Sequence, residues 1–155
     1  MENILPIEFL NRIKEEFGEP QAGRLSELLN GTSPTTVRVN PAKIQDPGAQ
    51  LELPIDTEVR MEGRSRYGVV LAQRPTFTLD PLFHAGAYYV QEGSSMAIEN
   101  RLPLYQEVLR ESADGKFRIL DLCAAPGGKS THLVSMFRDC PGAMVVSNEV
   151  IRSRA

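Results

Sequence analysis

The chain has 155 residues, of which 41% are hydrophobic and 24% charged, and its formal net charge at pH 7 is −3. This composition predicts a globular chain with a modest core and excludes an intrinsically disordered one. The acidic balance also argues against binding nucleic acid over a broad surface, so any RNA contact must be local.

The lack of a recognisable targeting signal and the small number of cysteines predict a cytoplasmic protein. The first residues show no basic stretch before a long apolar run, and no segment approaches the roughly 18 apolar residues of a membrane helix. Only Cys123 and Cys140 are present, too few and too widely spaced for a zinc site or a disulfide framework. We therefore expect a soluble protein with reduced thiols, no metal and no membrane partner.

Two helices are predicted at the start of the chain. Apolar residues recur at helical spacing over residues 6–17, where Gly18 provides a stop. The same pattern returns over residues 21–30 and ends at Gly31. We expect these two helices to pack together.

A strand follows from residue 35, where the apolar period changes to two. Val37 and Val39 fall on one face, Arg38 and Asn40 fall on the other, and Pro41 ends the run. Further short strands are expected near residues 58–61 and 67–72. Residues 45–55 lie between the first strand and these later strands. They contain two prolines and no helical or strand periodicity of apolar residues, which predicts a loop.

The next elements are an extended segment at residues 87–90 and a helix that begins near Ser95 and ends before Pro103. After them comes an apolar run over residues 117–120 that ends in Asp121. It is followed by a turn with two consecutive glycines and a second helical pattern. Paired glycines let the backbone approach a ligand, and the first N–H groups of the helix lack partners, so this turn predicts a pocket for an adenosyl cofactor or a phosphate.

The two ligands require different residues around the turn. The phosphate-loop pattern G-x-x-x-x-G-K-[ST] aligns with residues 128–130, but its first glycine falls on Cys123. An adenosyl ribose needs an acidic residue at the end of the next strand, and Glu149 follows the apolar run at residues 143–146. Because a carboxylate accepts from both ribose hydroxyls, the pattern favours the adenosyl cofactor.

Several segments in the same order resemble the RNA 5-methylcytosine methyltransferases of the Nol1/Nop2/Sun family, with the bacterial ribosomal RNA branch most similar. The matching segments are TTVRVNP at residues 35–41, DPLFH at 80–84, FHAGAYYVQEGSSM at 83–96, DLCAAPGGKS at 121–130 and NEVIRSR at 148–154. The resemblance covers most of the chain.

The resemblance implies a fold of two domains. The first, residues 1–83, is an α+β N-terminal domain of RRM-like or ferredoxin-like fold that binds RNA. The second, residues 84–155, is the first part of an α/β Rossmann-like methyltransferase domain. Because a doubly wound sheet needs several βα units and only one helix and one strand fit after residue 122, we expect this domain to be incomplete.

The implied activity is S-adenosylmethionine-dependent methylation of cytosine carbon 5 in RNA, with 16S ribosomal RNA as the substrate and transfer RNA as an alternative. The family activates this carbon by adding a cysteine thiolate to carbon 6. Its Pro-Cys and Thr-Cys motifs do not occur here. We therefore assign no catalytic residue, interpret Cys123 and Cys140 as non-catalytic, and expect this chain alone to be inactive.

The resemblance assigns cofactor binding to the turn and to two later residues, namely Cys123, Ala124, Ala125, Pro126, Gly127, Gly128, Lys129, Glu149 and Arg154. It places Gln91, Ser94 and Ser95 beside the cofactor and substrate cleft, although a helix cap explains the serines equally well. For RNA we favour a loose basic group along the predicted strands, namely Arg38, Asn40, Arg60, Arg64, Arg66 and Arg74. An ordinary mixed surface is the alternative for that group.

Two other functions remain open. One is a degenerate phosphate-loop nucleotide-binding protein, which would bind ATP in preference to S-adenosylmethionine. The other is a non-catalytic RNA-binding remnant, in which only the N-terminal domain folds stably and RNA binds without the cofactor.

Overall fold

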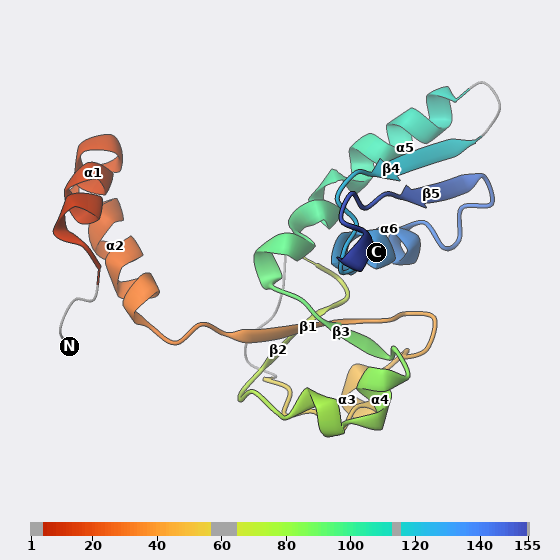
Figure 1. The fold of residues 1–155 in the computed structure, drawn as a ribbon, viewed down its shortest axis with the longest axis horizontal. Helices are drawn as coiled ribbons and strands as arrows, with labels where there is room; N and C mark the ends of the chain where they lie inside the picture. Colours follow the sequence, from red (N-terminus) through yellow and green to blue (C-terminus); the bar gives the residue numbers. More distant parts are fainter. Residues whose placement is uncertain (1–4, 57–64, 113–115, 155) are drawn as a thin grey trace. The chain divides into compact units, whose positions relative to one another are not determined.

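The computed structural model describes residues 5–56, 65–112 and 116–154 (Figure 1). The chain divides after Pro34 into two compact units. The first contains two helices, α1 (Ile7–Phe17) and α2 (Glu19–Asn30), and the second begins with β1 (Thr35–Val39). The boundary predicted between residues 83 and 84 therefore falls inside the second unit.

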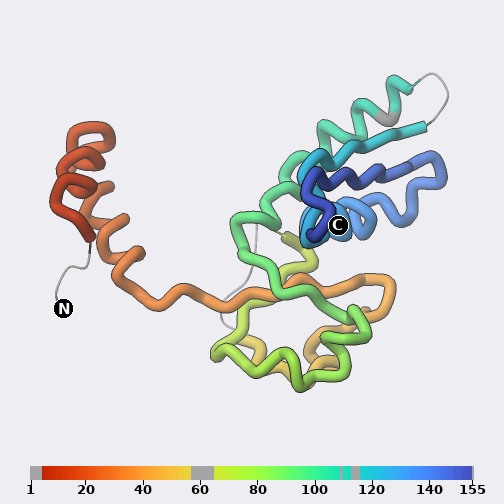
Figure 2. The backbone as a smooth tube through the Cα atoms, viewed as in Figure 1, coloured from red at the N-terminus to blue at the C-terminus, as the bar shows by residue number. Residues whose placement is uncertain are grey.

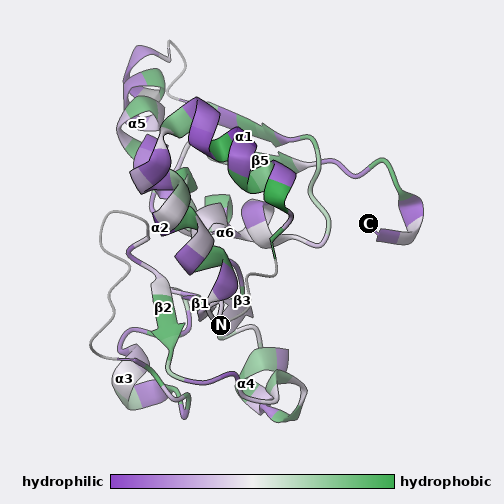
Figure 3. Ribbon diagram, turned by 90° about the vertical axis from the view of Figure 1, so that its left-hand side faces the viewer, coloured by the Kyte–Doolittle hydropathy of each residue, from purple (hydrophilic) through white to green (hydrophobic). Residues whose placement is uncertain are grey.

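The helices α1 and α2 confirm the two elements predicted from helical spacing, and they pack against each other. Gly18 separates them with a φ of +87°, a conformation that favours glycine, and its N–H donates to the Lys14 carbonyl. The second helix starts two residues earlier than predicted, because Pro20 is accommodated in its first turn. Leu10 and Ala22 are buried. Figure 3 shows hydrophobic and hydrophilic residues side by side along α1.

The second unit opens with a three-stranded antiparallel sheet of order β2-β1-β3, which contains β2 (Gly68–Leu71) and β3 (Tyr88–Val90). Val37 of the central strand lies opposite Val69 and Val90. The strands predicted at residues 67–72 and 87–90 are confirmed. The one predicted at 58–61 lies outside the described residues.

Pairing of β3 with β1 carries this sheet across the predicted domain boundary. Residues 84–90 therefore belong with the N-terminal sheet, which sequence period alone does not reveal. The RRM-like or ferredoxin-like fold is not confirmed by this three-stranded arrangement.

Short helices and loops cover one face of the sheet. They include α3 (Pro47–Gln50), a 3-10 turn η1 (Phe77–Leu79) and α4 (Pro81–His84). The helix α3 forms inside the predicted loop because the Asp46 carboxylate accepts from the N–H groups of Gly48 and Ala49. The core on this side consists of Val37, Val39, Ile44, Leu51, Leu71, Phe77, Ala87 and Tyr88.

After β3 the chain forms a 3-10 segment η2 (Gly93–Arg101) and then α5 (Leu102–Glu111). The helix predicted to begin near Ser95 and end before Pro103 corresponds to η2, but α5 follows it directly and was not predicted. Pro103 occupies the first turn of α5, where its missing N–H costs no hydrogen bond. The predicted serine cap is also absent, since the hydroxyls of Ser94 and Ser95 donate to Glu92 instead.

The last part of the unit is a β-α-β arrangement, built from β4 (Phe117–Asp121), α6 (Gly128–Met136) and β5 (Ala143–Ser147), with a final 3-10 turn η3 (Arg152–Arg154). The strands β4 and β5 pair in parallel, as the tube in Figure 2 also shows. This confirms the predicted order of strand, glycine turn, helix and strand. None of the described helices is long and apolar enough to cross a membrane.

A cluster of aromatic rings holds α5, β4 and the end of α6 together. Phe137 lies 4.9 Å from the ring of Phe117 and 5.6 Å from that of Tyr105, measured between ring centroids. Leu133 and Met136 of α6 complete the buried cluster. This cluster fixes the helix that follows the glycine turn.

We expect Phe137→Ala to lower the free energy of unfolding by about 3–5 kcal/mol, because it removes a ring shared by two neighbours. The matched control is Leu104→Ala on α5, where the side chain is 53% exposed and the expected change stays within about 0.5 kcal/mol. Chemical denaturation of the intact protein measures both. Equal, small losses would show that the ring cluster does not hold α6.

Candidate functional site

The glycine turn after β4 is held closed by Asp121. One carboxylate oxygen accepts from the Cys123 N–H at 3.2 Å, and the other accepts from the hydroxyl of Ser130 at 2.6 Å. Ser130 is buried. Asp121 was not predicted as a site residue. The available signal was an aspartate at the strand end with a serine just beyond the glycine pair.

The two glycines have separate roles in the turn. Gly127 has a φ of +100°, so a side chain there would be strained, and its carbonyl accepts from the Thr131 hydroxyl at 2.6 Å. Gly128 lies close to Tyr89, since a Cβ at this position would sit 3.4 Å from that ring. The turn therefore packs closely against the end of β3.

Glu149 and Arg154 both reach this turn. The Glu149 carboxylate accepts from the Ala125 N–H at 3.1 Å and from the Ile151 N–H at 2.9 Å. Hydrogen bonds from the backbone of Ile151 and Ala125, with Arg154 nearby, lower the pKa of Glu149. Arg154 donates to the Ala125 carbonyl at 3.3 Å. Glu149 and Arg154, which were predicted apart from the turn, thus both contact Ala125.

A cavity of about 250 Å³ lies against the turn, and we call it the turn cavity. Six of the predicted cofactor residues line it, namely Cys123, Ala124, Ala125, Pro126, Gly128 and Lys129. The opposite wall comes from the end of β3 and the segment after it, through Tyr89, Val90, Gln91, Glu92 and Ser95. Gly127, Glu149 and Arg154 support the turn without lining this cavity.

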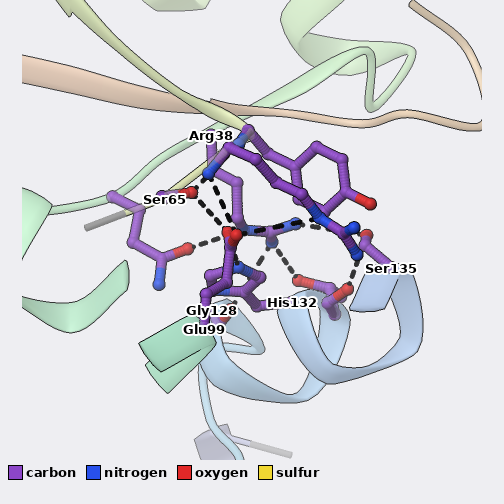
Figure 4. A network of polar contacts seen from close by, with 10 residues as sticks. Arg38, Ser65, Glu99, Gly128, His132 and Ser135 are labelled. Atoms are coloured by element: carbon purple, nitrogen blue, oxygen red, sulfur yellow. Dashed lines mark hydrogen bonds and ion pairs between the residues drawn. The ribbon is translucent and has the colours of Figure 1, made fainter. Parts of the chain in front are cut away.

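Arg38 lies buried between β1 and α6 and is 3% exposed. Its Nε donates to the Gln91 Oε1 at 2.8 Å, and its Nη2 donates to the Thr131 hydroxyl at 2.6 Å (Figure 4). Burial lowers the pKa of Arg38, and the charges of Glu99 and Tyr89 oppose that shift. Arg38, which the sequence predicts as an RNA contact, therefore donates its hydrogen bonds to Gln91 and to α6, and contact with RNA at this residue stays a prediction.

Glu99 on η2 forms a second buried contact with α6. Its carboxylate accepts from His132, at 2.7 Å, and from the hydroxyl of Ser65 (Figure 4). The N–H of Arg66 donates to the other oxygen at 3.0 Å. Burial alone would raise the pKa of Glu99, but hydrogen bonds from His132, Ser65 and Arg66 outweigh it and lower the pKa.

The other predicted RNA contacts that the structure describes each contact a different part of the chain. Asn40 holds a loop, with its amide donating to the Gly86 carbonyl at 3.0 Å. Arg66 pairs with Glu99 at 3.8 Å, and Arg74 lies over the ring of Phe77. Arg60 and Arg64 lie outside the described residues.

Comparison with known proteins gives a consistent set of relatives. Residues 5–93 match the family described as the N-terminal domain of 16S rRNA methyltransferase RsmF. Ribosomal RNA small subunit methyltransferase B of Pasteurella multocida is 29% identical over 145 residues, covering 94% of this chain and 29% of that protein. Ribosomal RNA small subunit methyltransferase F of Serratia proteamaculans is 37% identical over 70 residues, covering 45% of this chain and 13% of that protein.

The fold has a solved counterpart. The crystal structure of a methyltransferase homolog protein from Pyrococcus horikoshii superposes with a TM-score of 0.69 at 27% identity. It covers 97% of this chain, which corresponds to 46% of that chain. The present chain thus spans less than half of each of these three proteins.

Acidification tests the buried Glu99 carboxylate. Folding lowers the pKa of Glu99 from 4.5. The ionised carboxylate therefore contributes its full stabilisation of the folded protein above that pH, and this contribution is lost as the pH falls through the folded pKa. We expect the melting temperature of the wild type to fall more steeply below pH 4.5 than that of Glu99→Gln. Glu107→Gln, on an exposed position of α5, should keep the wild-type slope. Parallel curves for the wild type and Glu99→Gln would contradict this role.

Proposed function

Because this chain belongs to the family of the 16S rRNA methyltransferase RsmF, whose N-terminal domain matches residues 5–93, we propose that it is part of an S-adenosylmethionine-dependent RNA methyltransferase. The proposed reaction is methylation of carbon 5 of a cytosine in 16S ribosomal RNA, with transfer RNA as an alternative substrate. The observation that carries the proposal is the convergence of the glycine turn and Glu149 beside the turn cavity.

The residues at the turn fit this cofactor. The turn cavity is slightly smaller than the roughly 300–1,000 Å³ usual for small ligands, so it encloses part of the molecule. Gln91 lines it and carries a buried amide Nε2 with no partner among the described residues, a donor suited to a polar ligand. When bound, S-adenosylmethionine supplies an electrophilic methyl group on sulfur.

Glu149 would hold the ribose. Each of its carboxylate oxygens accepts one backbone N–H and has a second lone pair for a ribose hydroxyl. Its lowered pKa keeps the carboxylate ionised at neutral pH. The same contacts fix its position, so the acceptor is preorganised. Arg154 donates a hydrogen bond to the Ala125 carbonyl and thereby supports the turn.

A phosphate-loop nucleotide site is less favoured by the charges at the turn. The carboxylates of Asp121 and Glu149 both bond to its backbone, through Cys123 and Ala125. Two anions at these positions would repel a triphosphate. We therefore propose that β4, α6 and β5 form the first parallel unit of a Rossmann-like methyltransferase domain.

Neither cysteine is proposed as the nucleophile. Cys123 is exposed and lines the turn cavity, while Cys140 packs against the aromatic cluster of Phe117 and Phe137. Neither follows a proline or a threonine in the sequence. The residues proposed here bind and orient the methyl donor, and methyl transfer is proposed for the whole protein.

We expect Glu149→Gln to weaken S-adenosylmethionine binding about 10- to 100-fold, because hydrogen bonds to a charged acceptor contribute about 1.5–3 kcal/mol. Calorimetry on the intact protein measures the affinity. Asp139→Asn, which removes an 88% exposed carboxylate, is the matched control and should leave it unchanged.

Equal affinity for the wild type and Glu149→Gln would remove Glu149 from the site. Binding of ATP but not of S-adenosylmethionine would replace the proposed function by the phosphate-loop alternative. Binding of RNA alone would favour the non-catalytic one.

A further inference from the structure

A second cavity, which we call the basic groove, shares Tyr89 with the turn cavity. It has a volume of about 420 Å³ and lies between β1, β3, the segment after β1, and α6. Three cations line it, Arg38, Lys43 and Arg138, and no aspartate or glutamate is among its described lining residues. In a chain of net charge −3, this is a local concentration of positive charge.

Two of these cations are accessible and held in place. Lys43 and Arg138 are both exposed. The Lys43 ammonium donates to the Ala85 carbonyl, and the Arg138 guanidinium donates to the Pro41 carbonyl at 2.6 Å. Backbone carbonyls do not neutralise charge, and an ammonium has three donors and a guanidinium five, so donors remain for an anion. The contact of Arg138 with Asp139 is exposed at both ends and weak.

Tyr89 supplies an aromatic surface between the two cavities. Its hydroxyl donates to the Pro126 carbonyl of the glycine turn at 3.3 Å, and the Arg38 guanidinium lies 5.8 Å from its ring centroid. These contacts fix the ring. A fixed aromatic ring beside phosphate-binding cations is the combination that single-stranded nucleic acid recognises.

We propose that the basic groove binds a segment of single-stranded RNA, with phosphates at Lys43 and Arg138 and a base against Tyr89. The strand would thereby be led to the turn cavity, because Tyr89 belongs to both. This inference rests on the proposed function and names the substrate path for it. It keeps Arg38 and Asn40 from the RNA face predicted from the sequence, since both line the groove, and adds Lys43 and Arg138 to them.

The test is the salt dependence of RNA binding by the intact protein without cofactor. The probe is a labelled single-stranded RNA of about 12 nucleotides, within the span of known single-strand sites. Each phosphate contact contributes about 0.7 to the slope of log affinity against log salt concentration. We expect Lys43→Gln/Arg138→Gln to reduce that slope by about 1.4.

Two double variants serve as controls. Arg101→Gln/Arg110→Gln removes the same charge from exposed positions on η2 and α5, and it should keep the wild-type slope. Lys43→Arg/Arg138→Lys keeps both charges and should also keep it, which separates charge from a folding defect. Tyr89→Leu should weaken binding about 5- to 100-fold, whereas Tyr89→Phe keeps the ring and should not.

A slope that falls equally in the groove variant and in the exposed-charge control would overturn the groove. The groove would also be overturned if polyglutamate bound with the same salt slope as RNA and lost the same part of that slope in the groove variant. The site would then recognise charge on any polyanion. If the wild type binds S-adenosylmethionine and the groove variants bind RNA with the wild-type affinity and salt slope, this inference alone is refuted. Wild-type protein that binds RNA through the groove but no S-adenosylmethionine refutes the proposed function alone.

Discussion

The buried guanidinium of Arg38 is the interaction on which the second unit depends. A charge removed from water must be fully hydrogen-bonded, and the partners of Arg38 come from the end of β3 and from α6, through Gln91, Thr131 and Gly128. The glycine turn leads directly into that helix. The position of the turn is therefore set by the three-stranded sheet, and losing this one side chain would leave the buried amide oxygen of Gln91 without its donor.

Glu99 and the aromatic cluster of Phe137 complete the attachment of α6. Glu99 bonds to His132, which is next to the residues that Arg38 contacts, and the rings fix the helix end. The turn cavity and the basic groove then lie beside a helix held at several points. Tyr89, which lines both cavities, belongs to β3 and lies opposite Arg38 of β1 in the strand register. A methyl donor and an RNA strand would meet at a position that the sheet defines.

The local parts of this arrangement could be predicted from the sequence, and the long-range parts could not. Glycine pairs and strand period are local patterns, and they predicted the order of strand, turn and helix. Glu149 contacts the turn, and its role at a ribose stays a proposal. Arg38 was assigned to the surface because alternation shows which face a side chain is on but not what covers that face. The pairing of β3 with β1 joins residues about fifty positions apart, and no local pattern encodes it. Pro103 was taken as a stop although its position in a first helical turn is equally compatible with proline.

The central claim, that Arg38 holds α6 and the glycine turn on the sheet, is tested most directly by amide hydrogen exchange on the intact protein. Arg38→Met should accelerate exchange across residues 128–136 while leaving α1 and α2 unchanged. Arg38→Lys should give an intermediate result, because an ammonium cannot reproduce the fork of a guanidinium. Unchanged exchange in α6 of Arg38→Met would contradict the claim and show that Glu99 and the aromatic cluster suffice to hold the helix.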